Sequence, residues 1–322
     1  MEMQLEQIQR MAHDIKANIQ KVVVGKDEVI DKLLIALIAS GHILLEDVPG
    51  TGKTLLAKAM AKSIDGSFKR IQFTPDLLPS DLTGINFYNQ KLSEFEFRPG
   101  PLFTNLLLAD EINRATPRTQ SSLLECMEER QVSIDGETRL LERPFMVIAT
   151  QNPVENQGTF PLPEAQLDRF LFKIQMGYPN TEEGLDILKR FKAENPLDTI
   201  SSVADAADIA AAQQHYAKVA VSEDLLAYLL AIVEKTRSHA DVTTGVSPRG
   251  SQALLKAAQV HAVLRGRDFV IPDDVKAMAP SVLAHRMMIK GSFRSRSEAA
   301  EAVVAAILRE VSVPAEPNLL SS

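Results

Sequence analysis

One stretch has the composition of a phosphate-binding loop: Gly50-Thr51-Gly52-Lys53-Thr54. The glycines let the backbone turn sharply, so that successive N–H groups can point at one anion. At this spacing the lysine reaches the β- and γ-phosphates of a nucleotide, and the threonine hydroxyl binds Mg²⁺. The sequence therefore predicts a nucleotide-binding site formed by Pro49, Gly50, Thr51, Gly52, Lys53, Thr54 and Leu55.

The elements around this loop decide how much the pattern means. Asp47 stands where the general pattern has its first glycine, so a chance Gly-Lys-Thr turn is the alternative. However, residues 41–46 have the pattern of a buried strand, and residues 55–62 are rich in helix-forming types. A strand, a loop and a helix in this order direct the free N–H groups of the helix start toward the loop. This context favours phosphate binding over chance.

A pair of acids closes a second buried strand. The apolar residues 106–109 run directly into Asp110 and Glu111. Ligands of parallel sheets lie at the carboxyl ends of the strands, where both this pair and the phosphate loop are expected. Asp110 is predicted to hold Mg²⁺ through water, and Glu111 to orient and polarise an attacking water. The alternative is that both acids begin a surface loop, which carries little weight beside a phosphate-binding loop.

Three further polar residues are candidates with weaker support. Asn152 ends the next predicted strand and could position the same water, although an asparagine before Pro153 is equally typical of a turn. Arg169 by itself indicates a surface salt bridge with Asp168 or Glu164. Arg249 stands near the start of a predicted helix, where a positive charge gains nothing from the helix dipole. That misfit suggests a second role, in phosphate binding.

The order of elements predicts an α/β domain followed by a helical one. Apolar runs near residues 43, 70, 106, 145 and 172 alternate with helical patterns, and alternating segments at 84–98 and 131–140 predict β-hairpins. Beyond Pro179 the patterns are helical. We therefore predict an α/β nucleotide-binding domain over 1–178 and a helical lid over 179–322.

Bulk composition limits the class of protein. The 322 residues carry a formal net charge of −7, which disfavours a broad nucleic-acid surface. Cys126 is the sole cysteine, so an intrachain disulfide is excluded and a reducing compartment is expected. The first residues have no signal-peptide pattern, and no apolar run is long enough to span a bilayer. A cytoplasmic location is the expectation.

Taken together, these motifs resemble those of AAA+ ATPases, and more closely those of the MoxR family. The similarity covers essentially the whole chain. The segments that resemble the family's P-loop, Walker B, sensor 1, arginine-finger and sensor 2 motifs are, in that order, 46–54, 107–115, 149–153, 167–170 and 247–250. Val24 and Gly25 resemble the segment that lies against adenine. The hairpins resemble the helix-2 and pre-sensor-1 inserts of one AAA+ branch.

The resemblance implies an AAA+ module with a five-stranded parallel sheet in the order 5-1-4-3-2, flanking helices and two β-hairpin inserts. It implies ATP and Mg²⁺ as cofactors, with Asn152 as sensor 1 and Arg249 as sensor 2. It further implies a homo-oligomer, normally a hexamer, in which Arg169 reaches the ATP of the next subunit. Such an arginine contributes on the order of 10³–10⁵ in rate.

The expected function is ATP-driven, chaperone-like remodelling or activation of client proteins. A partner with a von Willebrand factor A domain is implied by the resemblance alone. The alternatives are a helicase-type DNA motor, which the hairpins would suit, a metal-chelatase motor subunit, and a nucleotide-dependent switch with negligible turnover. The acidic charge and the lack of a recognisable DNA-binding domain count against the DNA motor.

Overall fold

The computed structural model describes residues 3–46, 50–152, 158–192, 195–291 and 296–314. By their contacts the residues form two compact units. One comprises Arg10–Gln214, and the other comprises Gln4–Gln9 together with the chain from His215 onward. The predicted domain limits, 1–178 and 179–322, assign the intervening residues 179–214 differently. Because compactness alone does not fix where a domain ends, those limits stay a prediction.

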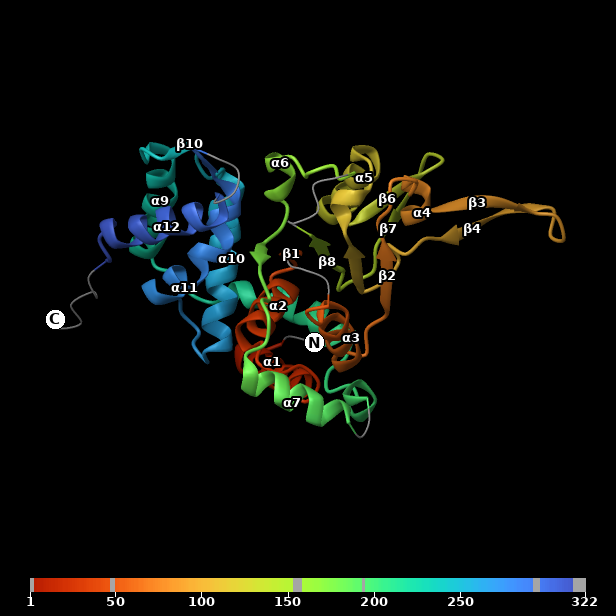
Figure 1. Cartoon of the computed structure of the whole chain (residues 1–322), viewed down its shortest axis with the longest axis horizontal. Helices are drawn as coiled ribbons and strands as arrows, with labels where there is room; N and C mark the ends of the chain where they lie inside the picture. Colours follow the sequence, from red (N-terminus) through yellow and green to blue (C-terminus); the bar gives the residue numbers. More distant parts are fainter. Residues whose placement is uncertain (1–2, 47–49, 153–157, 193–194, 292–295, 315–322) are drawn as a thin grey trace. The chain divides into compact units, whose positions relative to one another are not determined.

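The first unit is built on a parallel sheet (Figure 1). Within the described residues its strands are β1 (Ile43–Glu46), β2 (Phe68–Gln72), β5 (Leu106–Asp110), β8 (Met146–Gln151) and β9 (Phe172–Ile174). Their order across the sheet is β2-β5-β8-β1-β9. Numbered along the chain and read from the other edge, this is 5-1-4-3-2, so the predicted topology is confirmed. β5 is buried along its whole length because its apolar side chains meet helices on both faces.

Helices cover both faces of this sheet (Figure 1). On one face, Leu123 and Met127 of α5 belong to the same buried cluster as Leu107 and Val147 of the sheet. In addition, α2 contacts β9, and α3 contacts β5. Cys126 of α5 is buried in the same cluster, and its burial, with nearby Glu125, raises the pKa of its thiol to about 12. The helices that lie wholly or mostly in this unit are α1 (Leu5–Gln20), α2 (Asp27–Ile38), α3 (Lys53–Ser63), α4 (Pro79–Thr83), α5 (Pro117–Glu129), α6 (Glu164–Leu167), α7 (Thr181–Phe191) and α8 (Ala206–His215), with 3-10 turns η1 (Ile112–Arg114) and η2 (Pro196–Thr199).

Both predicted hairpins are present. β3 (Gly84–Asn89) pairs with β4 (Glu94–Pro99), and β6 (Gln131–Ile134) pairs with β7 (Glu137–Leu140). The Asp135-Gly136 turn has positive φ at both residues, 51° and 85°, as a two-residue hairpin loop requires. The β3–β4 ribbon extends away from the sheet (Figure 1).

The second unit is mainly helical, with a short strand pair that the sequence analysis missed. Its helices are α9 (Glu223–Ser238), α10 (Pro248–Leu264), α11 (Pro272–Leu283) and α12 (Arg296–Glu310), with 3-10 turns η3 (Tyr216–Lys218) and η4 (Ala284–Arg286). Ser222 and Ser247 cap α9 and α10 by accepting bonds from backbone N–H groups. β10 (Val242–Thr244) pairs with β11 (Met288–Ile289). Strands this short are too brief to show an alternating pattern.

Candidate functional site

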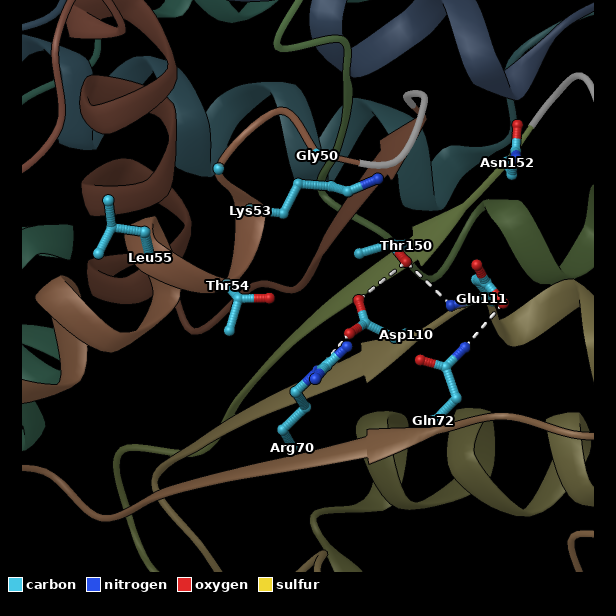
Figure 2. A pocket seen from close by; sticks show the side chains of 11 residues that line it. Gly50, Lys53, Thr54, Leu55, Arg70, Gln72, Asp110, Glu111, Thr150 and Asn152 are labelled. Atoms are coloured by element: carbon cyan, nitrogen blue, oxygen red, sulfur yellow. Dashed lines mark hydrogen bonds and ion pairs between the residues drawn. The ribbon is translucent and has the colours of Figure 1, made fainter. Parts of the chain in front are cut away.

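A cleft of about 370 Å³ lies at the carboxyl ends of the central strands (Figure 2). It brings the phosphate-loop motif and the acidic pair together, although they are far apart in the sequence. The described residues that line it are Gly50, Gly52, Lys53, Thr54, Leu55, Arg70, Gln72, Asp110, Glu111, Thr150 and Asn152. The convergence follows from topology, because the carboxyl ends of parallel strands share one edge of a sheet.

The loop before α3 supplies the phosphate-binding side of the cleft. Gly50 and Gly52 have φ of 86° and 90°, a region that strains residues with a side chain. Gly52 is the N-cap of α3, so Lys53 and Thr54 occupy the first helical turn, whose N–H groups have no partner within the helix. Helix starts of this kind favour anions. The predicted Pro49 lies outside the described residues.

A hydroxyl on β8 holds the acidic pair in place. Thr150 Oγ1 donates to Asp110 Oδ1 at 3.2 Å and accepts from the backbone N–H of Glu111 at 2.9 Å (Figure 2). The backbone of Glu111 is left-handed, with φ 55° and ψ 50°. A non-glycine residue in this region is uncommon, and its strain is sustained only by surrounding contacts. The bond from Glu111 to Thr150 is one such contact.

The carboxylates of Asp110 and Glu111 contact charged or amide side chains that were not predicted from the sequence. Gln72 Nε2 donates to Glu111 Oε2 at 2.7 Å, and Arg114 Nε lies 3.1 Å from the same oxygen. Arg70 Nε lies 2.5 Å from Asp110 Oδ2. A signal was present in the sequence, since Arg70 and Gln72 alternate on one predicted strand and so face the same side. The sequence pattern alone could not show that these two side chains contact the acidic pair, because that requires β2 to lie beside β5.

The strand that leads into the phosphate loop is fixed at its end. Glu46 accepts from Gln151 Nε2 at 2.6 Å and pairs with Lys173 Nζ at 2.8 Å. These partners stand on β8 and β9, the two neighbours of β1. The end of β1 is thus tied to both adjacent strands.

Asn152 lines the cleft, whereas two other predicted nucleotide contacts, Val24 and Gly25, are not among the described residues that line it. Asn152 is buried and lines the cleft just after β8. Val24 and Gly25 do not line it in the described part of the chain. They precede Lys26, whose Nζ donates to the carbonyl of Met176, two residues after β9, at 2.7 Å. The predicted Thr51 is partly exposed within the loop and is not among the described residues that line the cleft.

The two predicted arginines, Arg169 and Arg249, are also not among the described residues that line the cleft. Arg169 Nε pairs with Glu128 Oε2 of α5 at 2.8 Å, and both side chains are partly exposed. Arg169 thus forms an intrachain salt bridge, as its local sequence indicated, and one partner is Glu128 of α5. Arg249 is exposed in the first turn of α10, in the second unit.

The oxygen donors of the cleft suit Mg²⁺. A hydroxyl at Thr54 and a carboxylate at Asp110 are the ligand types that this hard cation prefers. Among the described residues, no group of three or more His, Cys, Asp and Glu side chains could hold a metal by itself. A metal bound here would therefore take further ligands from water and from the phosphates of a nucleotide.

Comparisons with known proteins agree with this geometry. Residues 42–172 match the model of the ATPase family associated with various cellular activities (AAA), and residues 234–307 match that of the AAA lid domain. The chain is 53% identical to the uncharacterized protein YeaC of Bacillus subtilis over 93% of both chains. It is 42% identical to the chaperone MoxR1 of Mycobacterium tuberculosis, over 92% of this chain and 80% of that protein.

A solved structure is similar over nearly the whole chain. It is that of an ATPase candidate from Cytophaga hutchinsonii, with a TM-score of 0.88, 39% identity and 96% of each chain covered. This chain thus contains the phosphate loop, the acidic pair and a segment that matches the AAA lid domain. Relatives of the chain are named MoxR. The chain is an ATPase and belongs to the MoxR family of AAA+ proteins.

Proposed function

We propose that the protein is a Mg²⁺-dependent ATPase that assembles into a hexameric ring and uses ATP hydrolysis to remodel or activate client proteins. The observation that carries the proposal is the meeting of Lys53, Asp110 and Glu111 in one cleft. A lysine that holds the phosphates and a residue that orients the attacking water are recurring parts of sites that hydrolyse nucleotides.

Each residue has a role that its chemistry suits. Lys53 and the N–H groups at the start of α3 would hold the β- and γ-phosphates. Glu111 would orient and polarise the attacking water from its fixed position beside Thr150. Asn152 would donate an amide hydrogen bond toward the γ-phosphate or the water. Val24 and Gly25 would lie against the adenine.

Thr54 and Asp110 would hold Mg²⁺, Thr54 through its hydroxyl and Asp110 through water. When bound, the ion would neutralise charge on the phosphate oxygens. The matching ligand types in the cleft support this part of the proposal.

Assembly would complete the site. We place Arg169 at the γ-phosphate of the neighbouring subunit, with Arg249 responding to the same phosphate from the lid. An arginine supplied by another chain stabilises the charge of the transition state. In the single chain Arg169 pairs with Glu128, so the guanidinium would have to leave this contact when a neighbouring subunit binds.

The hairpins would transmit the motion to a client. Tyr88 and Phe95 form an edge-to-face pair near the end of the β3–β4 ribbon, 5.3 Å between ring centroids, and are 52% and 74% exposed. Exposed aromatic side chains of this kind mark interaction sites. The ribbon is also tied to β6–β7, since Asn86 Nδ2 donates to Asp135 Oδ2 at 2.8 Å.

The partners follow from the relatives. Relatives of this chain are named as a chaperone and as MoxR proteins, which supports a protein client. A partner with a von Willebrand factor A domain is proposed on the family resemblance alone. Within the described residues, no helix has the length and apolarity needed to cross a membrane. A DNA motor remains the second candidate because the hairpins would suit it, and salt-sensitive DNA binding would identify it.

The test is a trap variant. Glu111→Gln should bind ATP with Mg²⁺ but not hydrolyse it, because an amide cannot accept the proton of water. Crosslinking and sedimentation of the ATP-bound trap should give a hexamer, and pull-downs should recover clients. The matched control is Glu125→Gln, on an exposed position of α5, which should hydrolyse ATP normally. Normal hydrolysis by Glu111→Gln would contradict the assigned role, and a monomeric trap would contradict the ring.

A further inference from the structure

Arg70 carries a positive charge into the cleft from the edge strand β2. β2 and β5 are parallel, with Arg70 paired in register with Leu108 and Gln72 with Asp110. Because residues two apart face the same side of a sheet, Arg70 and Gln72 both reach the acidic pair. Figure 2 shows the Arg70 side chain directed at Asp110, on the side away from Glu111.

This arginine contacts the carboxylate that is proposed to hold the metal. Its Nε lies 2.5 Å from Asp110 Oδ2, and the other oxygen, Oδ1, accepts from Thr150. Both carboxylate oxygens thus have protein donors, one neutral and one positively charged. A cation that approaches Asp110 competes with the charged donor.

The ion pair between Arg70 and Asp110 contributes little to folding stability. The side chain of Arg70 is 51% exposed, and ion pairs with a partner so open to water contribute little to folding stability. The side chain of Asp110 is 9% exposed, so its own charge is poorly screened. The main effect of the ion pair is therefore on the binding of cations by Asp110.

We infer that Arg70 is a positioning residue that keeps a fixed positive charge on Asp110 and thereby weakens Mg²⁺ binding at this carboxylate. The inference rests on the proposed Mg²⁺ dependence of the site. With Arg70 in place, the cleft attracts a free divalent cation poorly, and the triphosphate must supply the missing negative charge. Mg²⁺ then enters together with ATP, and the site does not fill with metal alone.

The test measures binding of a fluorescent, non-hydrolysable ATP analogue, so it does not depend on turnover. Its Kd is determined in EDTA and in saturating Mg²⁺ for the wild type, Arg70→Gln and Arg70→Lys. Lys69→Gln is the matched control, because it removes one positive charge from the same strand but on the other face, where Lys69 Nζ donates to the carbonyl of Gly100 at 3.3 Å. Isothermal titration with MgCl₂ alone follows metal binding to the free protein.

Removing the charge should strengthen Mg²⁺ binding at Asp110. In Arg70→Gln, the Kd in Mg²⁺ should fall about tenfold while the Kd in EDTA stays at the wild-type value. MgCl₂ alone should bind this variant more tightly than the wild type. Arg70→Lys keeps the charge and should resemble the wild type, as should Lys69→Gln.

Three results would overturn the inference. The first is an unchanged or higher Kd in Mg²⁺ for Arg70→Gln. The second is a loss of binding in EDTA, which would make Arg70 a phosphate ligand. The third is an equal gain in Lys69→Gln, which would make the effect one of net charge. If the wild type binds the ATP analogue with the same Kd in EDTA and in Mg²⁺, the proposed Mg²⁺ dependence is wrong, and the inference that rests on it is wrong as well.

Discussion

The side-chain amide of Gln72 donates a hydrogen bond to the carboxylate of Glu111 at 2.7 Å, across the boundary between β2 and β5. Arg114 Nε lies 3.1 Å from the same oxygen, Oε2. The carboxylate is therefore held from two sides while its backbone is held by Thr150. Because the proposed base has a defined orientation, its neighbours should affect turnover more than nucleotide affinity.

Gln72→Ala tests this orientation. Loss of one hydrogen bond to a charged group should lower kcat about tenfold and leave the Kd for ATP nearly unchanged. Steady-state hydrolysis and equilibrium binding separate the two quantities. Gln90→Ala, an exposed glutamine of the β3–β4 turn, is the control and should keep the wild-type kcat. Equal kcat values for Gln72→Ala and the wild type would show that Gln72 does not orient the base.

Mixed subunits test whether Arg169 acts in a neighbouring site. Lys53→Ala and Arg169→Ala proteins should each be inactive alone. Mixing them should restore part of the ATPase activity, because an intact phosphate loop can then meet an intact arginine from the other variant. Activity is measured against mixing ratio at fixed total protein. A mixture as inactive as its components, with subunit exchange verified by fluorescence energy transfer, would argue against a finger supplied in trans.

His42 should make stability depend on pH. It is buried, accepts from the Val147 N–H at its Nδ1 at 2.9 Å, and donates from Nε2 to Met127 O at 3.0 Å. Burial, with the positive charge of Arg130, lowers its pKa from 6.5 to about 3. Only the unfolded chain then takes up this proton below pH 6.5, so stability should fall as the pH drops from 6.5 toward 3, by about 1.4 kcal/mol per pH unit from this residue.

Urea unfolding at several pH values between 7 and 4 measures this dependence. His42→Gln lacks the titrating group, so its stability, though lower at neutral pH, should vary less with pH than that of the wild type. His13→Gln, at an exposed position of α1, should keep the wild-type slope. If His42→Gln retains the full slope, other groups cause the acid sensitivity.

Asp274 should be essential to the stability of the second unit. It is 1% exposed and pairs with Arg267 through two contacts of 2.6 Å, while His261 Nδ1 lies 2.6 Å away. Burial by itself would raise its pKa, but the hydrogen bonds from Arg267, His261 and the Ile271 N–H outweigh this and lower it to about 2. The ionised network therefore stabilises the fold above about pH 3.8, and this contribution is lost as the pH falls toward 2.

Asp274→Ala removes the buried carboxylate that accepts from Arg267, which is 23% exposed, and should cost about 1–3 kcal/mol. Asp273→Ala removes an exposed carboxylate one residue away and should change stability by less than about 0.5 kcal/mol. Thermal unfolding of the full chain compares the two variants directly. Equal losses would mean that the network does not carry the stability assigned to it.

Local patterns were enough to predict much of this molecule. The phosphate loop could be identified because Gly52, Lys53 and Thr54 are adjacent and lie between a strand and a helix. The Asp135-Gly136 turn revealed its hairpin because positive φ restricts the residue types. The strand pair β10–β11 was missed because its strands are short and pair across a long stretch of sequence.

By itself, the sequence determined the order of elements and the residues that end the central strands. Those features depend on hydrophobic period and on neighbouring residues, which are local properties. Only the tertiary structure decided which side chains surround the acidic pair. Arg70, Gln72 and Thr150 reach Asp110 and Glu111 because β2 and β8 flank β5 in a particular register. The pairing of Arg169 with Glu128 was decided in the same way, because contacts between distant segments depend on packing, which spacing along the chain does not encode.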